Sequence, residues 1–189
     1  MEFTPLGIEG AWLASSPIWA DERGSFREWF KGADIQAATG LDFSIVQANL
    51  SRSKRGVLRG IHYSLAPVGQ AKWVTCASGA VWDVVVDIRP DSPTFKMWVG
   101  VELLGASGDV LLISAGLGHG FVSLQDDSVI SYLLTSPYSP KEEFEINPLD
   151  AELAIKWPSM ELFRSPKDSA APTLATRILE GRLPLALKS

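Results

Sequence analysis

Short runs of branched and aromatic residues, separated by turn-forming residues, constrain the fold of this chain most strongly. The 16 glycines and 12 prolines are spread along the sequence. They bound runs rich in Val, Ile, Trp and Phe, which is the pattern of many strands joined by turns. The clearest run, 80–88, alternates with period two and places Trp82 on one face and Asp83 on the other. The sequence therefore predicts an all-β protein.

Further strands and two short helices are expected along the chain. The other predicted strands are 45–49, 56–63, 71–77, 97–103, 110–113, 120–124 and 129–135. Their even spacing favours a sandwich or a jelly-roll barrel. Residues 33–39 and 173–180 are each followed by a glycine, which predicts two short helices that decorate the barrel.

The length of the chain indicates one domain. The chain has 189 residues, 46% of them hydrophobic, and a domain typically has about 150 residues. We expect a single domain over 1–189, with a barrel at about 40–140, an N-terminal arm and a C-terminal segment that wraps the barrel. The single Cys76 cannot form an intrachain disulfide and is expected to be a small core residue.

Charge and hydropathy exclude two classes of partner. The net charge of −5 has the wrong sign for a protein that mainly holds nucleic acid. The sequence shows neither an apolar run of about 18 residues nor a charged-then-apolar leader, so no membrane partner is expected. These features predict a soluble, cytoplasmic protein.

The two histidines, His62 and His119, limit the chemistry that an imidazole can perform here. Small β-barrels often hold a metal with three histidines and a carboxylate, and this chain cannot supply three. Tyr63 and Ser64 follow His62, so the same strand face offers no second imidazole for a metal pair. No metal site is expected.

Charged residues inside apolar runs are the other candidates for chemistry. Lys72 shares a strand face with Val74 and Cys76. The alternative is a surface lysine whose stem alone is buried. Arg59 and His62 share a strand-like run that is either part of a site or a solvated edge strand. Asp83 lies among β-branched residues and must be either solvated or paired.

Several motifs in fixed order resemble the dTDP-4-dehydrorhamnose 3,5-epimerase family, and the resemblance covers nearly the whole chain. The matching runs are 21–28 (DERGSFRE), 47–49 (QAN), 56–63 (GVLRGIHY), 70–72 (QAK), 82–84 (WDV), 92–95 (SPTF), 116–121 (GLGHGF), Tyr132, 138–140 (YSP), 157–158 (WP) and 165–168 (SPKD). The chain departs from the common pattern at Ser64, Lys141, Glu142, Phe144 and Glu145.

The resemblance implies a cupin-type jelly roll, usually a homodimer, that inverts carbons beside the ketone of a dTDP-4-keto-6-deoxy sugar without a metal or an organic cofactor. A C–H beside a ketone needs a positioned base and a group that neutralises the developing enolate. By resemblance, His62 is the base, Lys72 stabilises the enolate and Tyr132 is the acid on the opposite side. Asp168 is the partner of the base, and Asp83 is a second carboxylate near the site.

The resemblance also implies a set of substrate-binding residues. Arg23, Arg59 and Lys167 match positions that hold the diphosphate, a group for which arginine forks are well suited. Tyr138 resembles the aromatic residue that stacks on thymine. The remaining matching residues are Phe26, Glu28, Gln47, Ala48, Asn49, His119 and Glu143.

Strand parity raises one geometric question about this site. Arg59 and His62 are three residues apart and would face opposite sides of a regular strand. They reach one ligand only if a bulge forms near Gly60 or the diphosphate turns around the barrel mouth.

Three functions that need no metal are compatible with these residues, and a metal-dependent cupin oxygenase or isomerase is a further alternative that a metal analysis of the purified protein would test. The first is epimerisation at C3 and C5, and the second is epimerisation at C3 alone. The third is a sugar-nucleotide-binding cupin without catalysis, which would be expected to lose the base or the acid.

Overall fold

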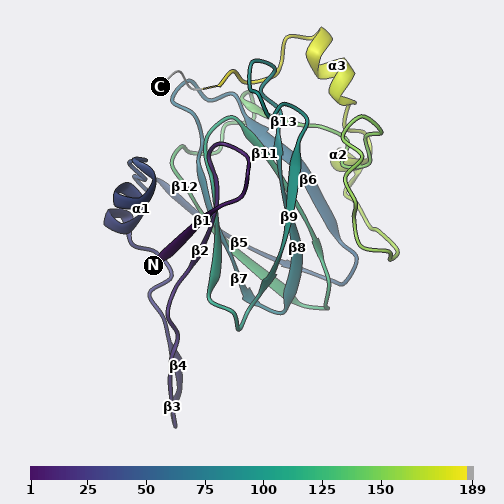
Figure 1. Cartoon of the computed structure of the whole chain (residues 1–189). Coiled ribbons are helices and arrows are strands. Elements are labelled where there is room, and N and C mark those ends of the chain that lie inside the picture. The colour runs from purple at the N-terminus through teal and green to yellow at the C-terminus, as the bar shows by residue number, and fades with distance from the viewer. Residues whose placement is uncertain (187–189) are drawn as a thin grey trace.

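Two antiparallel sheets pack face to face in the computed structural model, which describes residues 1–186 (Figure 1). In spatial order, the six-stranded sheet contains β1 (Glu2–Pro5), β2 (Ala11–Ser15), β10 (Asp109–Ile113), β7 (Lys72–Ser78), β12 (Ser128–Leu134) and β5 (Gln47–Ser53). The five-stranded sheet contains β13 (Glu143–Glu145), β6 (Leu58–Ser64), β11 (Leu117–Ser123), β8 (Ala80–Asp87) and β9 (Trp98–Leu104). The predicted all-β fold is confirmed, as an open sandwich rather than a closed barrel.

The strands predicted from the sequence correspond to β5 to β12, with ends that differ by a few residues. The sandwich also contains β1 and β2, which lie before the range 40–140 expected for the barrel, and β13, which lies after it. The sequence signal of these three strands is weak because each is short and none alternates cleanly between buried and exposed residues.

The helices lie outside the sandwich. The helix α1 (Gly32–Thr39) ends at Gly40, whose φ of 76° is the left-handed conformation that favours glycine. The helix α3 (Leu174–Leu179) begins after Thr173, whose hydroxyl accepts a hydrogen bond from the backbone N–H of Thr176. Both predicted helices are confirmed. The four-residue helix α2 (Pro166–Ser169) was not predicted.

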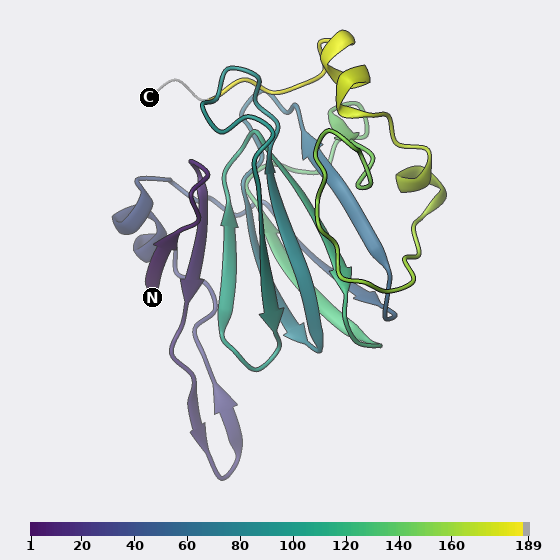
Figure 2. The same ribbon diagram turned by 45° about the vertical axis from the view of Figure 1, so that its right-hand side comes forward.

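Three apolar clusters hold the layers together. The central cluster lies between the two sheets and includes Cys76, which is fully buried as predicted. A second cluster packs the outer face of the six-stranded sheet against α1 and its flanking loops. The third packs the outer face of the five-stranded sheet against the C-terminal segment, which Figure 2 shows running along that side of the sandwich.

This covering of both sheet faces explains the surroundings of the run 80–88. Trp82 and Val84 belong to the outer cluster, as the period-two pattern predicts. Asp83 lies on the inner face with Val81 and Val85, and it is fully buried rather than solvated. A buried carboxylate needs a partner, and this one is positioned toward the interior of the sandwich.

A hairpin of β3 (Trp19–Asp21) and β4 (Gly24–Phe26) projects from the sandwich, as both ribbon views show (Figure 2). All six strand residues are exposed. In the part of the chain that the structure describes, none of the helices is long and apolar enough to cross a membrane.

Candidate active site

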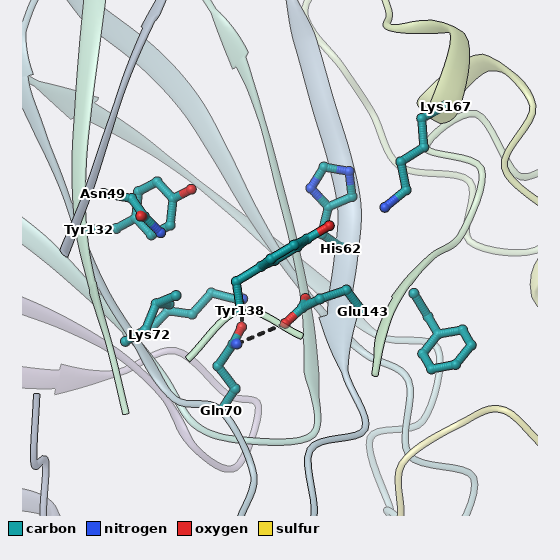
Figure 3. A pocket seen from close by; sticks show the side chains of 10 residues that line it. Asn49, His62, Gln70, Lys72, Tyr132, Tyr138, Glu143 and Lys167 are labelled. Carbon is teal, nitrogen blue, oxygen red and sulfur yellow. Dashed lines mark hydrogen bonds between the residues drawn. The ribbon is translucent and has the colours of Figure 1, made fainter. Parts of the chain in front are cut away.

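A cleft opens into the sandwich between the two sheets, and three of the predicted catalytic residues line it together. His62, Lys72 and Tyr132 border two adjoining cavities. The outer cavity is also lined by Asn49, Gln70, Leu134, Tyr138, Glu143, Phe144 and Lys167. The inner cavity is also lined by Ser51, Arg59, His119, Gly120, Phe121 and Ile130. Figure 3 shows the residues of the outer cavity.

A bulge in β6 brings Arg59 and His62 to the same cleft. His62 pairs with His119 and Arg59 pairs with Phe121, so three steps along β6 oppose two steps along β11. Gly60 lies between them with a φ of 122°, and a Cβ there would lie 2.5 Å from the Cα of Gly120. Only glycine fits this close approach of two strands. Of the two explanations for a shared ligand, the bulge is confirmed.

His62 is held by Asp168. The Nε2 atom of His62 lies 2.6 Å from Oδ1 of Asp168, and the two side chains are 40% and 5% exposed. Burial raises the pKa of Asp168, but hydrogen bonds from His62 and Ser165 outweigh burial and hold the pKa below its ordinary value. The carboxylate is therefore ionised at neutral pH and accepts the Nε2 hydrogen. The Nδ1 atom of the neutral imidazole is then the free proton acceptor.

Lys72 presents a buried ammonium to the same cleft. Its side chain comes from β7, in the sheet opposite His62, and its Nζ atom donates a hydrogen bond to Oε1 of Gln70. Burial lowers the pKa of Lys72 to about 8, although the negative charge of Glu143 acts in the opposite direction. The surface alternative considered for this lysine is wrong, because the residue is 7% exposed.

Tyr132 lies beside Lys72 on the same wall of the cleft. Its strand, β12, pairs with β7 on one side and with β5 on the other, and Tyr132 lies opposite Asn49 of β5. Burial raises the pKa of the Tyr132 hydroxyl, while Asn49 and Arg59 act to lower it. The phenol therefore keeps its proton at neutral pH, as a proton donor must.

Asp83 forms a second histidine–carboxylate pair. Its Oδ1 atom lies 2.8 Å from Nε2 of His119 on the adjacent strand β11. Burial raises the pKa of Asp83, against the opposing effect of His119. The paired alternative for this carboxylate is thus confirmed. The pair borders the inner cavity through His119, whereas the Asp168 pair borders both cavities through His62.

The rim of the outer cavity carries the predicted binding residues of the C-terminal half. Tyr138 is exposed there, and its backbone N–H donates to Oε1 of Gln47 at 2.8 Å. The other end of the Gln47 amide donates to Oδ1 of Asn49 at 2.9 Å. The Nζ atom of Lys167 lies 3.1 Å from Oε2 of Glu145. Glu145 is one of the residues that depart from the family pattern, and it gives this lysine an ionic partner.

Phe144, another of the departures from the family pattern, has a packing role. Its ring stacks on Tyr63 with a centroid distance of 5.8 Å. The guanidinium groups of Arg177 and Arg182 lie 5.3 and 5.5 Å from the centre of the same ring. These contacts fix β13, the strand that carries Glu143, against β6 and the C-terminal segment.

Gln47 contacts the cavity residues Asn49 and Tyr138 without lining either cavity itself, and four other predicted binding residues lie outside both cavities of this chain. Arg23 and Phe26 belong to the projecting hairpin, where Arg23 forms an ion pair with Asp21. Glu28 is exposed just after that hairpin, and Ala48 is exposed on β5. A single copy of the chain does not bring these residues to His62.

Two further residues hold the site, and parity or capping signals in the sequence could have identified them. Gln70 lies two residues before Lys72, so in an extended chain the two side chains are expected to point to the same side. Ser165 begins the Ser-Pro-Lys-Asp run, a helix-start signal. Its hydroxyl accepts from the backbone N–H of Asp168 at 3.0 Å and donates to Oδ2 of Asp168 at 2.8 Å.

The histidine–carboxylate pairs are separate rather than gathered around one point. Within residues 1–186, His, Cys, Asp and Glu side chains form no group of three or more that could hold a metal ion.

Comparison with known proteins gives concordant results. Residues 5–176 match the family model described as dTDP-4-dehydrorhamnose 3,5-epimerase. A dTDP-4-dehydrorhamnose 3,5-epimerase of Mycolicibacterium smegmatis is 47% identical over 180 residues, which is 95% of this chain and 89% of that protein.

Two solved structures share both fold and sequence. NovW, a 4-keto-6-deoxy sugar epimerase of Streptomyces spheroides, superposes with a TM-score of 0.95 at 45% identity, covering 98% of this chain and 93% of that one. ChmJ, a 3'-monoepimerase of Streptomyces bikiniensis in complex with dTDP-quinovose, has a TM-score of 0.92 at 47% identity, covering 96% and 92%.

Proposed function

This chain belongs to the dTDP-4-dehydrorhamnose 3,5-epimerase family, and we propose that it inverts C3 and C5 of a dTDP-4-keto-6-deoxyhexose without a cofactor. It is an epimerase that acts on a carbohydrate. The observation that carries the residue-level proposal is the cleft in which His62, Lys72 and Tyr132 face one space from two sheets. The sequence-based expectation of a cytoplasmic enzyme is part of this proposal.

The first step is removal of a proton from the carbon beside the ketone. Nδ1 of His62 accepts this proton, and the electron pair of the C–H bond moves into an enolate. Asp168 supports the step in two ways: it fixes the tautomer that exposes Nδ1, and its negative charge stabilises the imidazolium that forms.

The second requirement is stabilisation of the enolate oxygen. Lys72 is the cation on the wall opposite His62, and the low dielectric of its buried position strengthens its attraction for a developing negative charge. By analogy with a single oxyanion-hole donor, this interaction is worth about 3 kcal/mol. The lysine must be protonated to supply it.

Inversion then requires a proton from the other face of the enolate. Tyr132 is on β12 of the six-stranded sheet, and His62 is on β6 of the five-stranded sheet, so the two groups approach from opposite walls. The raised pKa of Tyr132 keeps its proton available for transfer. This arrangement favours catalysis over the alternative of a sugar-nucleotide-binding cupin, which needs neither group.

Residues of both cavities form the proposed nucleotide site. Arg59 and Lys167 provide positive charge, and the exposed ring of Tyr138 is free to stack on a base. Stacking on a nucleobase contributes about 1 to 3 kcal/mol in other systems. Asn49, His119 and Glu143 offer hydrogen-bonding groups toward the same space.

The proposed homodimer accounts for the binding residues that lie outside the cleft. The projecting hairpin exposes Trp19 and Phe26, whose stacked rings have centroids 5.9 Å apart. An exposed aromatic pair on an extended hairpin is costly for a monomer. A second copy would cover these rings and receive Arg23 and Glu28 at its own cleft.

Epimerisation at C3 alone is the second candidate, because ChmJ, a 3'-monoepimerase, is as similar to this chain as the 3,5-epimerase of Mycolicibacterium smegmatis. Incubation of the enzyme with dTDP-4-keto-6-deoxyglucose in D₂O, followed by NMR, distinguishes the two. Deuterium at C3 and C5 is the expected result. Deuterium at C3 alone would support the second candidate, and no deuterium would refute the epimerase proposal for this substrate.

A further inference from the structure

A buried amide separates a cation from an anion within the candidate site. Gln70 is 5% exposed and lies between Lys72 of β7 and Glu143 of β13, as Figure 3 shows. Its Oε1 atom accepts a hydrogen bond of 2.5 Å from Nζ of Lys72. Its Nε2 atom donates a hydrogen bond of 2.9 Å to Oε1 of Glu143. One side chain thus satisfies both charged groups.

The geometry points to Gln70 as a positioning residue that holds the Lys72 ammonium at the junction of the two cavities and prevents it from pairing directly with Glu143. The inference rests on the proposed function for its kinetic consequence. Its structural content, the location and ionisation of Lys72, is independent of any substrate.

The argument begins with what a buried ammonium needs. An isolated buried charge is costly, and a buried lysine therefore requires an acceptor or a counter-ion. Among the described residues, Lys72 is within 4.0 Å of no carboxylate oxygen, whereas Lys167 and Lys96 each form an ion pair. The neutral amide is the acceptor that Lys72 uses.

The two ends of the amide explain why a glutamine suits this position. A carboxylate here would attract Lys72 but repel Glu143. An apolar residue would offer no hydrogen bond to either group, so that the two charges could pair only with each other. An amide can accept at one end and donate at the other. The amide also leaves the remaining hydrogens of the Lys72 ammonium free to bind a ligand oxygen. A direct ion pair with Glu143 would instead draw the ammonium toward the rim of the cleft.

The pKa of Lys72 depends on whether its ammonium contacts the amide of Gln70 or the carboxylate of Glu143. Burial lowers its pKa to about 8, with Glu143 opposing the shift. Groups on all neighbouring elements face the same space: His62 and Arg59 of β6, His119 of β11, Tyr132 of β12, Glu143 of β13 and Lys167 of α2. Glu143 is the only carboxylate among these groups, so Lys72 should move toward it if the spacer is lost.

The test replaces the spacer by a side chain of similar shape without hydrogen-bonding groups. In Gln70→Met, we expect the pKa of Lys72 to rise by about one pH unit, because direct pairing with an anion favours the charged form. The pKa is measured by NMR of ¹³Cε-labelled lysine in substrate-free protein, with Lys72→Met assigning the signal. In Gln70→Met/Glu143→Gln, the same pKa should fall below the wild-type value.

Kinetics provide the second readout. Displacement of the ammonium should lower the kcat of Gln70→Met by roughly 10-fold or more, because a shift of about 1 Å in a catalytic group is enough to produce such a loss. The loss in kcat should exceed any change in KM, because the negative charge that Lys72 stabilises develops only in the transition state. The amide of Gln70→Asn is too short to span both Lys72 and Glu143, so this variant should change the pKa of Lys72 and kcat in the same directions as Gln70→Met. It keeps the inference testable if the methionine variant does not fold.

Two results would overturn the inference. One is an unchanged or lowered pKa of Lys72 in folded Gln70→Met, and the other is a kcat that equals that of the wild type. If the pKa rises as expected but the wild-type protein exchanges no deuterium into the sugar, the spacer role stands and the proposed reaction fails.

Discussion

At the residue scale, the site combines two charged groups whose protonation states are set by different physical causes. Hydrogen bonds keep Asp168 ionised in spite of its burial, so that it can orient His62. Desolvation acts on Lys72 with only a neutral partner in direct contact, so its proton is held less firmly than that of a surface lysine. Each cause gives a separate prediction.

Asp168→Asn should lower kcat by up to about 10⁴-fold while the protein remains folded, by analogy with the loss of the carboxylate from a catalytic triad. The amide can donate to Nε2 of His62 and so favour the tautomer whose Nδ1 carries the proton. Steady-state kinetics on the 4-keto sugar measure this loss. Retention of more than a tenth of the wild-type kcat would show that Asp168 does not set the tautomer.

The ionisation of Lys72 predicts opposite pH trends for activity and stability. As pH rises through about 8, kcat/KM should fall, because the ammonium is lost. The folded pKa lies below the ordinary 10.5, so the unfolded chain binds more protons between these values and the Lys72 contribution to stability rises with pH. Denaturant unfolding of wild type and Lys72→Met from pH 7 to 10 tests the sign. A gap between their unfolding free energies that stays constant over this range would contradict it.

At the element scale, alternation along the chain predicts the long strands, but periodicity alone does not predict the local features that position the site. The alternation in 80–88 correctly predicted that Trp82 and Asp83 lie on opposite faces of the strand, but it did not predict that Asp83 faces the interior of the sandwich while the face of Trp82 packs against the C-terminal segment. The pairing of His62 with Asp168 depends on α2, a helix too short for a periodic pattern. The bulge was recognised as one of two options, because parity cannot distinguish a bulge from a turn of the ligand.

The bulge of β6 predicts that Gly60→Ala is strongly destabilising. A methyl group at this φ would also collide with Gly120, so we expect a loss of about 3 kcal/mol or more in unfolding free energy. Gly7→Ala is the matched control, since Gly7 also has a positive φ but no heavy atom within 4 Å of the added Cβ. Equal losses in the two variants, measured by denaturant unfolding, would show that the strand contact is unimportant.

At the scale of the whole molecule, the separation of Arg23 from His62 is the main discrepancy between the expected site and a single chain. A symmetric dimer resolves it if each hairpin reaches the cleft of the other copy. Arg23→Ala and His62→Asn homodimers should then both be inactive. Their random co-assembly should restore about a quarter of wild-type activity, because one of the two sites in each mixed dimer has both residues intact. The absence of any recovery in verified mixed dimers would refute the exchange of hairpins.

The opposed placement of a base and an acid is the central claim, and Tyr132→Phe in D₂O tests it most directly. With His62 intact, the variant should still remove the proton next to the ketone and return deuterium from the same side. NMR should therefore show deuterium in sugar whose configuration is unchanged, while His62→Asn shows none. Inverted, deuterated product at the wild-type rate from Tyr132→Phe would contradict the account.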